Sequence, residues 1–293
     1  MKINEELKKY NIKPCKYTNV GNITIVDTND SRYVIKRNNY NDVYNYLKVR
    51  NYSYYPEVIS DLKDSYIITK YISSNNMPDE QKIDDIIDLI SLLHNKTTHF
   101  KEVDSDEYHR LYDDLNNNII YLFQYYNDLM TIIESKIYFS PPEYLLARNI
   151  SKIYLSLDIS KKLLDKWYED VISIKNKRLV VLHNNLKLDH FIYSDKPYLI
   201  SWDKSRIDMP IFDLYKLYKN EGDKFSYDET LKRYEKDYPL KDYERNLFFI
   251  LLLLPPKIEF KDTLVNMCIE IDKVLKEIDK ANEFISPYYL KDS

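Results

Sequence analysis

The residues best suited to chemistry lie in one stretch of the chain, from Arg178 to Leu217. Its polar loop contains His183, Asn185 and His190, and Asp203 follows thirteen residues after the second histidine. An imidazole can bind a metal or transfer a proton, a carboxylate is a preferred ligand of hard cations, and an amide both donates and accepts hydrogen bonds. This set of side chains predicts a polar functional site.

Two short strands are expected to position these loops. Residues Phe191 to Tyr193 and Tyr198 to Trp202 have the apolar character of buried strands, with a Lys-Pro turn between them, and the second strand stops at Asp203. Side chains carried at the ends of strands on a rigid sheet can converge on one point. The arrangement is therefore more typical of an active site than of packing alone.

This stretch resembles the protein-kinase-like phosphotransferases, specifically the aminoglycoside phosphotransferase and choline kinase branch. The catalytic loop of that branch reads H-x-D-x-x-x-x-N, and its metal-binding strand ends in Asp. His183, Asn185 and His190 stand at the loop spacing, and Asp203 stands at the strand end.

A second resemblance follows directly in the sequence. Residues Ile207 to Leu214 read I-D-M-P-I-F-D-L and are similar to the D-x-P-x-x-D-L segment of the spore-coat-associated (CotS-type) members of that branch. The resemblance implies that Asp213 is a structural aspartate that anchors the loop around His183 to Asn185.

The resemblance also implies roles, and two positions depart from it. In that reaction class the loop Asp accepts the proton of the substrate hydroxyl, while the Asn and the strand-end Asp hold magnesium ions. Here Asn185 replaces the Asp, and an amide cannot accept that proton. His190 replaces the Asn, although imidazole suits zinc, copper or iron better than magnesium. Asp203 is the metal ligand that is kept, and His183 is implied to be structural.

A purely structural role also stays open for each of these residues at this point. Asp203 could open a turn, although its place after an apolar strand favours a ligand role. Asn185 could be a loop former, and His190 could be a satisfied structural histidine. Asp189 is a nearby carboxylate that could substitute for the missing base.

The first seventy or so residues are expected to form a β-rich small lobe. Apolar alternation and turn-prone segments predict five short strands and one helix. The strands are expected at Lys16 to Asn19, Ile23 to Asp27, Tyr33 to Arg37, Val58 to Leu62 and Tyr66 to Ile72, and the helix at Tyr40 to Arg50.

The small lobe contains candidate nucleotide contacts. The segment Y-V-I-K ending at Lys36 resembles the V-A-I-K motif, whose Lys pairs with nucleotide phosphates. The resemblance therefore places Lys36 and Asp203 within reach of a common phosphate. Gly21 is what remains of a glycine-rich loop, and it could simply serve a hairpin turn. Thr69 and Tyr71 fall in the expected hinge, where a base would bind to the backbone.

The helix of the small lobe departs from the resembled pattern. It should supply a Glu that orients Lys36, yet no Glu lies between Lys36 and Glu57. Asp42 is the nearest substitute, and its side chain is one methylene shorter.

From residue 75 the sequence predicts a helical large lobe, so the two domains are expected to be residues 1–74 and 75–293. Residues Ile83 to His94 carry an apolar stripe at helical spacing. Between residues 105 and 174 we expect two or three helices, with breaks near Ser140 to Pro142 and near Leu157 to Asp158. Further helices are expected at Tyr227 to Tyr238, Tyr243 to Leu254 and Thr263 to Asn282.

Composition limits the function classes. The formal net charge of -4, from 43 basic and 47 acidic residues, gives no electrostatic reason to expect nucleic acid. Cys15 and Cys268 form no disulfide or metal pattern and suit a reducing cytoplasm. The charged N-terminus is unlike a signal peptide. The longest apolar run, Leu247 to Leu254, is too short to cross a membrane.

The sequence as a whole predicts an α+β, bilobal, protein-kinase-like fold and two hypotheses for function. One is a catalytically impaired, pseudokinase-like protein that binds a nucleotide or takes part in a protein assembly such as a spore coat. The other is an active ATP-dependent phosphotransferase on a small hydroxylated acceptor. The resemblance implies ATP with Mg²⁺ or Mn²⁺ as the ligand set. Because transfer depends largely on positioning, Asn185 would impair it without necessarily abolishing it.

Overall fold

The computed structural model describes residues 2–38 and 43–289. The chain forms two compact units, and each is built from two segments of sequence. Residues 1–98 and 180–208 form the first, here called the sheet unit. Residues 99–179 and 209–293 form the second, the helical unit. The lobe boundary after residue 74 stays a prediction.

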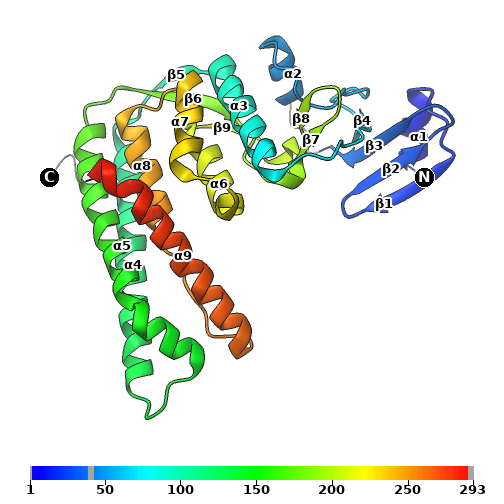
Figure 1. The fold of residues 1–293 in the computed structure, drawn as a ribbon. Helices are drawn as coiled ribbons and strands as arrows, with labels where there is room; N and C mark the ends of the chain where they lie inside the picture. The colour runs from blue at the N-terminus through cyan, green and yellow to red at the C-terminus, as the bar shows by residue number, and fades with distance from the viewer. Residues whose placement is uncertain (1, 39–42, 290–293) are drawn as a thin grey trace. The chain divides into compact units, whose positions relative to one another are not determined.

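The sheet unit begins with an antiparallel sheet (Figure 1). Strands β1 (Lys16–Val20), β2 (Ile23–Asp27), β3 (Arg32–Arg37) and β4 (Tyr66–Lys70) follow one another in that spatial order. Helix α1 (Lys2–Lys9) precedes them, and α2 (Val43–Val49) and α3 (Asp79–Thr97) complete the N-terminal segment.

The two faces of this sheet have different neighbours. Val26, Ile35 and Ile68 are buried in a core with Leu7 of α1 and with Ile12. Side chains alternate between faces along a strand, so the neighbours of these residues point to the opposite side. The register places Ile25 beside Val34 and Val34 beside Thr69, and it places Ile23 beside Lys36 and Lys36 beside Ile67. Lys36 therefore lies on the face that is turned away from the α1 core.

The second segment of the sheet unit carries the polar loops. The end of β6 (Asn176–Leu182) pairs with β9 (Arg206–Asp208), and β7 (Phe191–Tyr193) pairs with β8 (Pro197–Leu199). Two 3₁₀ turns, η1 (Leu188–His190) and η2 (Trp202–Lys204), lie between these strands.

Two predictions for the sheet unit need correction, and two of its elements were not predicted. Residues 58–62 do not form a strand, because Val58 makes only an isolated bridge to Thr69 and the Ser60 hydroxyl accepts the N–H of Ile68. The strand expected at Tyr198 to Trp202 ends at Leu199, because Ser201 adopts a left-handed conformation with φ of 67° that begins η2. Helix α1 and strand β9 were not expected.

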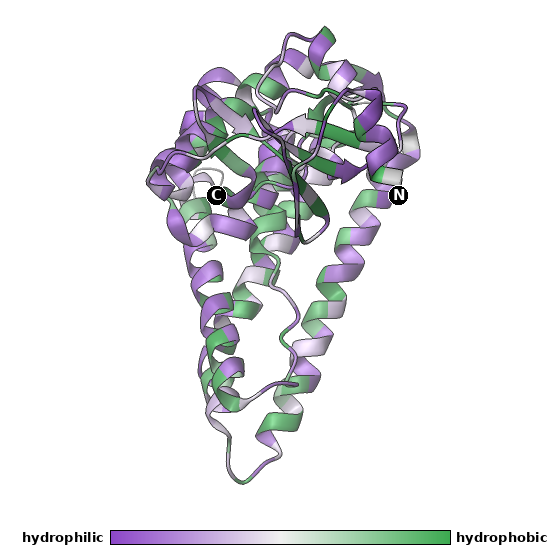
Figure 2. Ribbon diagram, turned by 90° about the vertical axis from the view of Figure 1, so that its right-hand side faces the viewer, coloured by the Kyte–Doolittle hydropathy of each residue, from purple (hydrophilic) through white to green (hydrophobic). Residues whose placement is uncertain are grey.

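The helical unit consists mainly of long helices (Figure 1). Figure 2 shows hydrophilic and hydrophobic residues along each of the long ones, as expected for helices with one buried stripe. Its elements are β5 (His99–Glu102), which pairs with the start of β6, and the helices α4 (Ser105–Glu134), α5 (Pro141–Val171), α6 (Ile211–Glu221), α7 (Tyr227–Asp237), α8 (Asp242–Leu253) and α9 (Leu264–Tyr289).

The predicted break near Ser140 is confirmed, and the break near Asp158 is wrong. Helix α5 starts after Ser140, whose hydroxyl and backbone form a capping box with Glu143. The helix continues through residues 157 and 158, because Leu157 is buried on its apolar stripe and Asp158 forms an ion pair with Lys162 one turn later. Within the described residues, no helix is both long and apolar enough to cross a membrane.

The capping box predicts a stability change in acid. The Lys136 ammonium and the backbone N–H of Ser140 lower the pKa of Glu143 from its ordinary value of 4.5 to about 2. Because the folded-state pKa is depressed, this stabilisation is present above pH 4.5 and is lost as the pH falls toward 2. Glu143→Gln should flatten this part of a plot of unfolding free energy against pH, measured by urea denaturation. Lys136→Met should give an intermediate slope, and a slope equal to that of the parent in both variants would contradict the assignment.

A buried ion pair in the helical unit gives a second prediction. Arg178 Nε donates to Glu244 Oε1 at 3.1 Å, and the Glu244 side chain is fully buried. Glu244→Ala leaves the guanidinium without its counter-charge and should cost about 3–5 kcal/mol of stability by chemical denaturation. The matched control is Asp272→Ala, which removes an exposed ion pair with Lys276 on α9 and should cost at most about 0.5 kcal/mol. Equal effects of the two changes would contradict the prediction.

Candidate functional site

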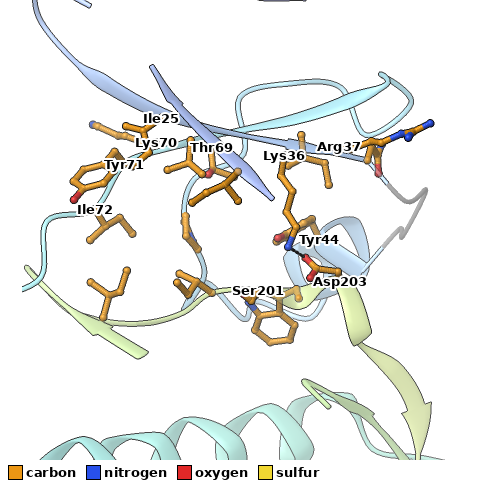
Figure 3. Close-up of a pocket in the computed structure, with 18 of the residues that line it drawn as sticks. Ile25, Lys36, Arg37, Tyr44, Thr69, Lys70, Tyr71, Ile72, Ser201 and Asp203 are labelled. Carbon is orange, nitrogen blue, oxygen red and sulfur yellow. Dashed lines mark hydrogen bonds and ion pairs between the residues drawn. The ribbon is translucent and has the colours of Figure 1, made fainter. Parts of the chain in front are cut away.

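Lys36 and Asp203 meet in the sheet unit. Strand β3 carries Lys36, η2 carries Asp203, and the Lys36 Nζ lies 2.5 Å from Asp203 Oδ1. Figure 3 shows the extended lysine side chain reaching this carboxylate. Both side chains keep about 30% of their surface exposed, at 30% and 29%. The two groups are thus within reach of one ligand, as the resemblance implied, while their roles toward that ligand stay predictions.

The pair lines a cavity of about 190 Å³ whose walls are mostly aliphatic. The sheet face that carries Lys36 supplies one wall, and residues around β7 and η2 supply another. Thr69 and Tyr71, both expected to contact a nucleotide, line the cavity as well. The aliphatic lining comes from Ile23, Ile25, Val34, Val43, Ile67, Ile72, Ile192 and Ile200.

The charged side chains that line the cavity point in different directions. Lys36, Arg37, Lys70 and Asp203 are the charged residues among the described lining. Figure 3 shows the Arg37 guanidinium pointing away from the Lys36–Asp203 pair, and Lys70 lies beside Tyr71 at the other end of the cavity. Among the described residues, Lys36 and Asp203 therefore set the charge at their end of the cavity, and their two charges offset each other.

Tyr44 is a further polar residue beside this pair. It lies in the first turn of α2 and lines the cavity near Asp203 (Figure 3). Burial raises the pKa of the Tyr44 hydroxyl, and the negative charge of Asp203 raises it further. Tyr44 is thus a neutral hydroxyl at neutral pH and can donate a hydrogen bond into the cavity.

Three consecutive side chains hold the segment that carries Asp203. His183 Nε2 lies 2.8 Å from the Ile200 carbonyl oxygen, and Asn184 Nδ2 donates to the Lys204 carbonyl at 2.9 Å. Asn185 Nδ2 donates to the Ser201 carbonyl at 3.4 Å. This group of contacts, here called the amide clamp, fixes the turn on both sides of Asp203. Asn185 therefore acts as a hydrogen-bond donor in the structure, a role that an ionised aspartate cannot fill.

His190 is engaged by the same loop. Its Nδ1 lies 2.6 Å from the Asn185 carbonyl oxygen, and its own carbonyl accepts the N–H of Ile200 at 2.9 Å. His183 packs edge-on against Trp202 with a centroid distance of 4.6 Å, which supports the structural role expected of it. Neither Asn185 nor His190 is among the described residues that line the cavity.

The donor set fits a divalent metal poorly. Asp203 is bound to Lys36, His190 offers nitrogen where Mg²⁺ requires oxygen, and the Asn185 amide faces a carbonyl through its nitrogen. In the part of the chain that the structure describes, no three His, Cys, Asp or Glu side chains are grouped so that they could hold a metal.

The remaining residues predicted for the site either do not line the cavity or lie outside the described residues. Gly21 has φ of +55° in the turn between β1 and β2, and open space surrounds the position where a Cβ would stand. Its conformation is explained by the hairpin turn. Asp213 is fully buried in the first turn of α6, and its contact with the loop around His183 stays a prediction. Asp42 lies outside the described residues.

Tyr44 was missed in the sequence, and Asn184 was expected only as a possible loop former, without its contact to the Lys204 carbonyl. Asn184 adopts φ of 56°, and asparagine is one of the few residue types that tolerate this conformation, so its position beside a candidate loop was a usable signal. Tyr44 gave no such signal, because it is one of 30 tyrosines in the chain.

The amide clamp predicts the cost of restoring an aspartate at residue 185. Asn185→Asp replaces a donor by a carboxylate that faces the Ser201 carbonyl, so the free energy of unfolding should fall by about 1–2 kcal/mol. Asp189→Asn is the control, because its side chain is exposed in the same loop and the change should be nearly neutral. Chemical denaturation measures both, and an Asn185→Asp variant as stable as the parent would show that the amide does not donate to Ser201.

No family model and no curated protein matches this sequence. Solved structures do match its fold. An aminoglycoside phosphotransferase from Alicyclobacillus acidocaldarius matches with a TM-score of 0.73 and 11% identity, over 98% of this chain and 95% of that one. The AMP-bound complex of a spectinomycin phosphotransferase matches with a TM-score of 0.57 and 13% identity, over 96% and 97%.

A choline kinase from Streptococcus pneumoniae matches with a TM-score of 0.50 and 16% identity, over 94% of this chain and 97% of that one. Identities this low establish the fold alone. The chain therefore has the α+β, protein-kinase-like fold of the aminoglycoside phosphotransferases and choline kinases.

Proposed function

We propose that this chain is a kinase-fold protein that binds an adenine nucleotide in the cavity beside Lys36 and Asp203 and is impaired in phosphate transfer. The observation that carries the proposal is the joint position of Lys36 and Asp203 at one end of an aliphatic cavity whose other end is the expected hinge. An apolar slot with a few polar groups at its ends is the usual form of a small-molecule site.

The hinge end supports the binding of a base. The N–H of Lys70 donates to the Glu57 carbonyl and the N–H of Tyr71 donates to the Arg32 carbonyl, so both are already used. Ile72 follows, lies outside β4 and lines the cavity, and we propose its N–H as the donor to the base. The Arg32 guanidinium covers the Tyr71 ring at 4.9 Å from its centroid, which holds the ring at the cavity wall.

The amide clamp supports impaired transfer. A kinase needs a carboxylate to receive the hydroxyl proton, and residue 185 is an amide that donates to the Ser201 carbonyl. The Lys36 charge is paired with Asp203, which the resemblance would assign to the metal. Residue 185 and Asp203, the positions that the reaction uses for the base and for the metal, are therefore both engaged in other contacts.

The alternative is an active phosphotransferase on a small hydroxylated acceptor. One structural neighbour, a spectinomycin phosphotransferase, was solved with ADP and spectinomycin, and this neighbour favours a small-molecule acceptor. Wild-type transfer of phosphate from ATP to a defined acceptor would establish this alternative and overturn the impaired state. A rise in ATP turnover in the double variant Asn185→Asp and His190→Asn would instead show that the wild-type residues cause the impairment.

A role in a protein assembly rests on the segment Ile207 to Leu214 alone. Its similarity to the spore-coat-associated members makes a spore-associated place for the protein a hypothesis beside nucleotide binding. Expression of the chain fused to a fluorescent protein in a spore-forming host would test it, and the absence of fluorescence from the spore would exclude it.

Nucleotide binding predicts a shift in thermal stability. A ligand that binds only the folded state adds about 2.7 kcal/mol at a hundredfold excess over its Kd, so AMP or ADP should raise the Tm without any turnover. Val34→Trp should remove the shift, because Val34 lines the cavity and the larger side chain would fill it. Ile137→Ser should keep the shift, because Ile137 is 91% exposed in the helical unit. No Tm shift of the parent with any adenine nucleotide would refute the proposal.

A further inference from the structure

We infer that the cavity takes adenosine or AMP without a divalent ion, and that each phosphate beyond the first weakens binding. The inference rests on the proposed function and specifies the ligand of the same cavity. It departs from the expectation of ATP with Mg²⁺ or Mn²⁺ that the sequence resemblance implied.

The first argument is the charge at the phosphate end of the cavity. Lys36 already has a counter-charge in Asp203, at 2.5 Å. Among the described residues that line the cavity, Asp203 is the sole acid, and the Arg37 guanidinium points away from the pair (Figure 3). In the part of the chain that the structure describes, the end that would receive phosphates therefore carries one positive and one negative charge and offers no surplus of positive charge to a polyphosphate.

The second argument is the state of the groups that would hold a metal. A nucleoside triphosphate depends on cations to offset its charge, and Mg²⁺ accepts oxygen ligands in near-octahedral geometry. The His190 Nδ1 is engaged by the Asn185 carbonyl, and the Asn185 amide nitrogen faces the Ser201 carbonyl. The Asp203 carboxylate is the one anionic oxygen ligand of the set, and its Oδ1 is bound to Lys36.

The third argument concerns what added phosphates would meet. A β- or γ-phosphate near Lys36 either takes the place of Asp203, which leaves that carboxylate without its counter-charge, or lies beside Asp203, where two negative groups are close together. Two unit charges 4 Å apart interact by about 1 kcal/mol in water and by about 4 kcal/mol near a protein surface. Even the lower value corresponds to an affinity about fivefold weaker for each negative charge that is left without a partner.

The rest of the cavity suits a nucleoside. Its walls are mostly aliphatic, and Tyr44 lines it near Asp203. A base can fill the aliphatic part, and a ribose can exchange hydrogen bonds with neutral and ionised groups at the polar end. Neither contact requires a metal.

Isothermal titration calorimetry with adenosine, AMP, ADP and ATP tests the inference, each ligand in EDTA and again with Mg²⁺ or Mn²⁺. Adenosine and AMP should bind in EDTA, the affinity should fall at least about fivefold from AMP to ADP and again from ADP to ATP, and the metals should not improve AMP binding. Affinity that rises with phosphate number, or binding that requires a divalent ion, would overturn the inference and leave the proposed function standing. No binding of any of the four ligands would overturn both.

Variants of Lys36 and Asp203 test whether the pair acts on the phosphates, because a purely structural role would not change the order of the four affinities. Asp203→Asn removes the negative charge and should tighten ADP and ATP at least about fivefold while adenosine changes little. Lys36→Ala should weaken ADP and ATP and leave adenosine binding, because Asp203 would lack its counter-charge. Asp208→Asn, in β9 of the same unit and paired with Arg206, is the control and should preserve the order of affinities. A uniform change for all four ligands in both Lys36→Ala and Asp203→Asn would show that the pair only supports the fold, and it would overturn the inference.

Discussion

The contact between Lys36 and Asp203 is the constraint on which the site depends, because it joins two segments that are 167 residues apart in the chain. Strand β3 brings the lysine, and the turn after β8 brings the carboxylate. A partly exposed ion pair contributes little to stability in water. Its importance lies in where it places charge, since it sets the charge that any ligand meets at that end of the cavity.

The small sheet makes this placement possible by dividing its side chains between two tasks. One face packs with α1 through Val26, Ile35 and Ile68, and the other face lines the cavity through alternate residues of the same strands. A slip of one residue in the pairing of β2 with β3 would turn Lys36 toward the α1 core. The register that buries Ile35 is therefore also the register that exposes Lys36 to the cavity.

The sequence predicted what local pattern and composition can specify. The strands β1 to β3 and the break at Ser140 followed from alternation and turn residues, while the meeting of Lys36 with Asp203 was implied by the resemblance to the phosphotransferases. The use of Asn185 as a donor could not be predicted, because its partner is the carbonyl of Ser201, whose left-handed backbone exists only once the two loops are packed together. The aliphatic cavity was also out of reach, since its lining comes from strands that are separated along the chain.

The amide clamp has a consequence for the routes by which this sequence could change. Because Asn185 supports the turn around Asp203, its replacement by aspartate exchanges structural support for a catalytic group within a single step. A second substitution that supplies another donor to the Ser201 carbonyl would offset this loss of support. Substitutions at residue 185 and in the turn it holds are therefore epistatic. Without another donor to the Ser201 carbonyl, the route to a proton-accepting carboxylate at residue 185 passes through a less stable protein.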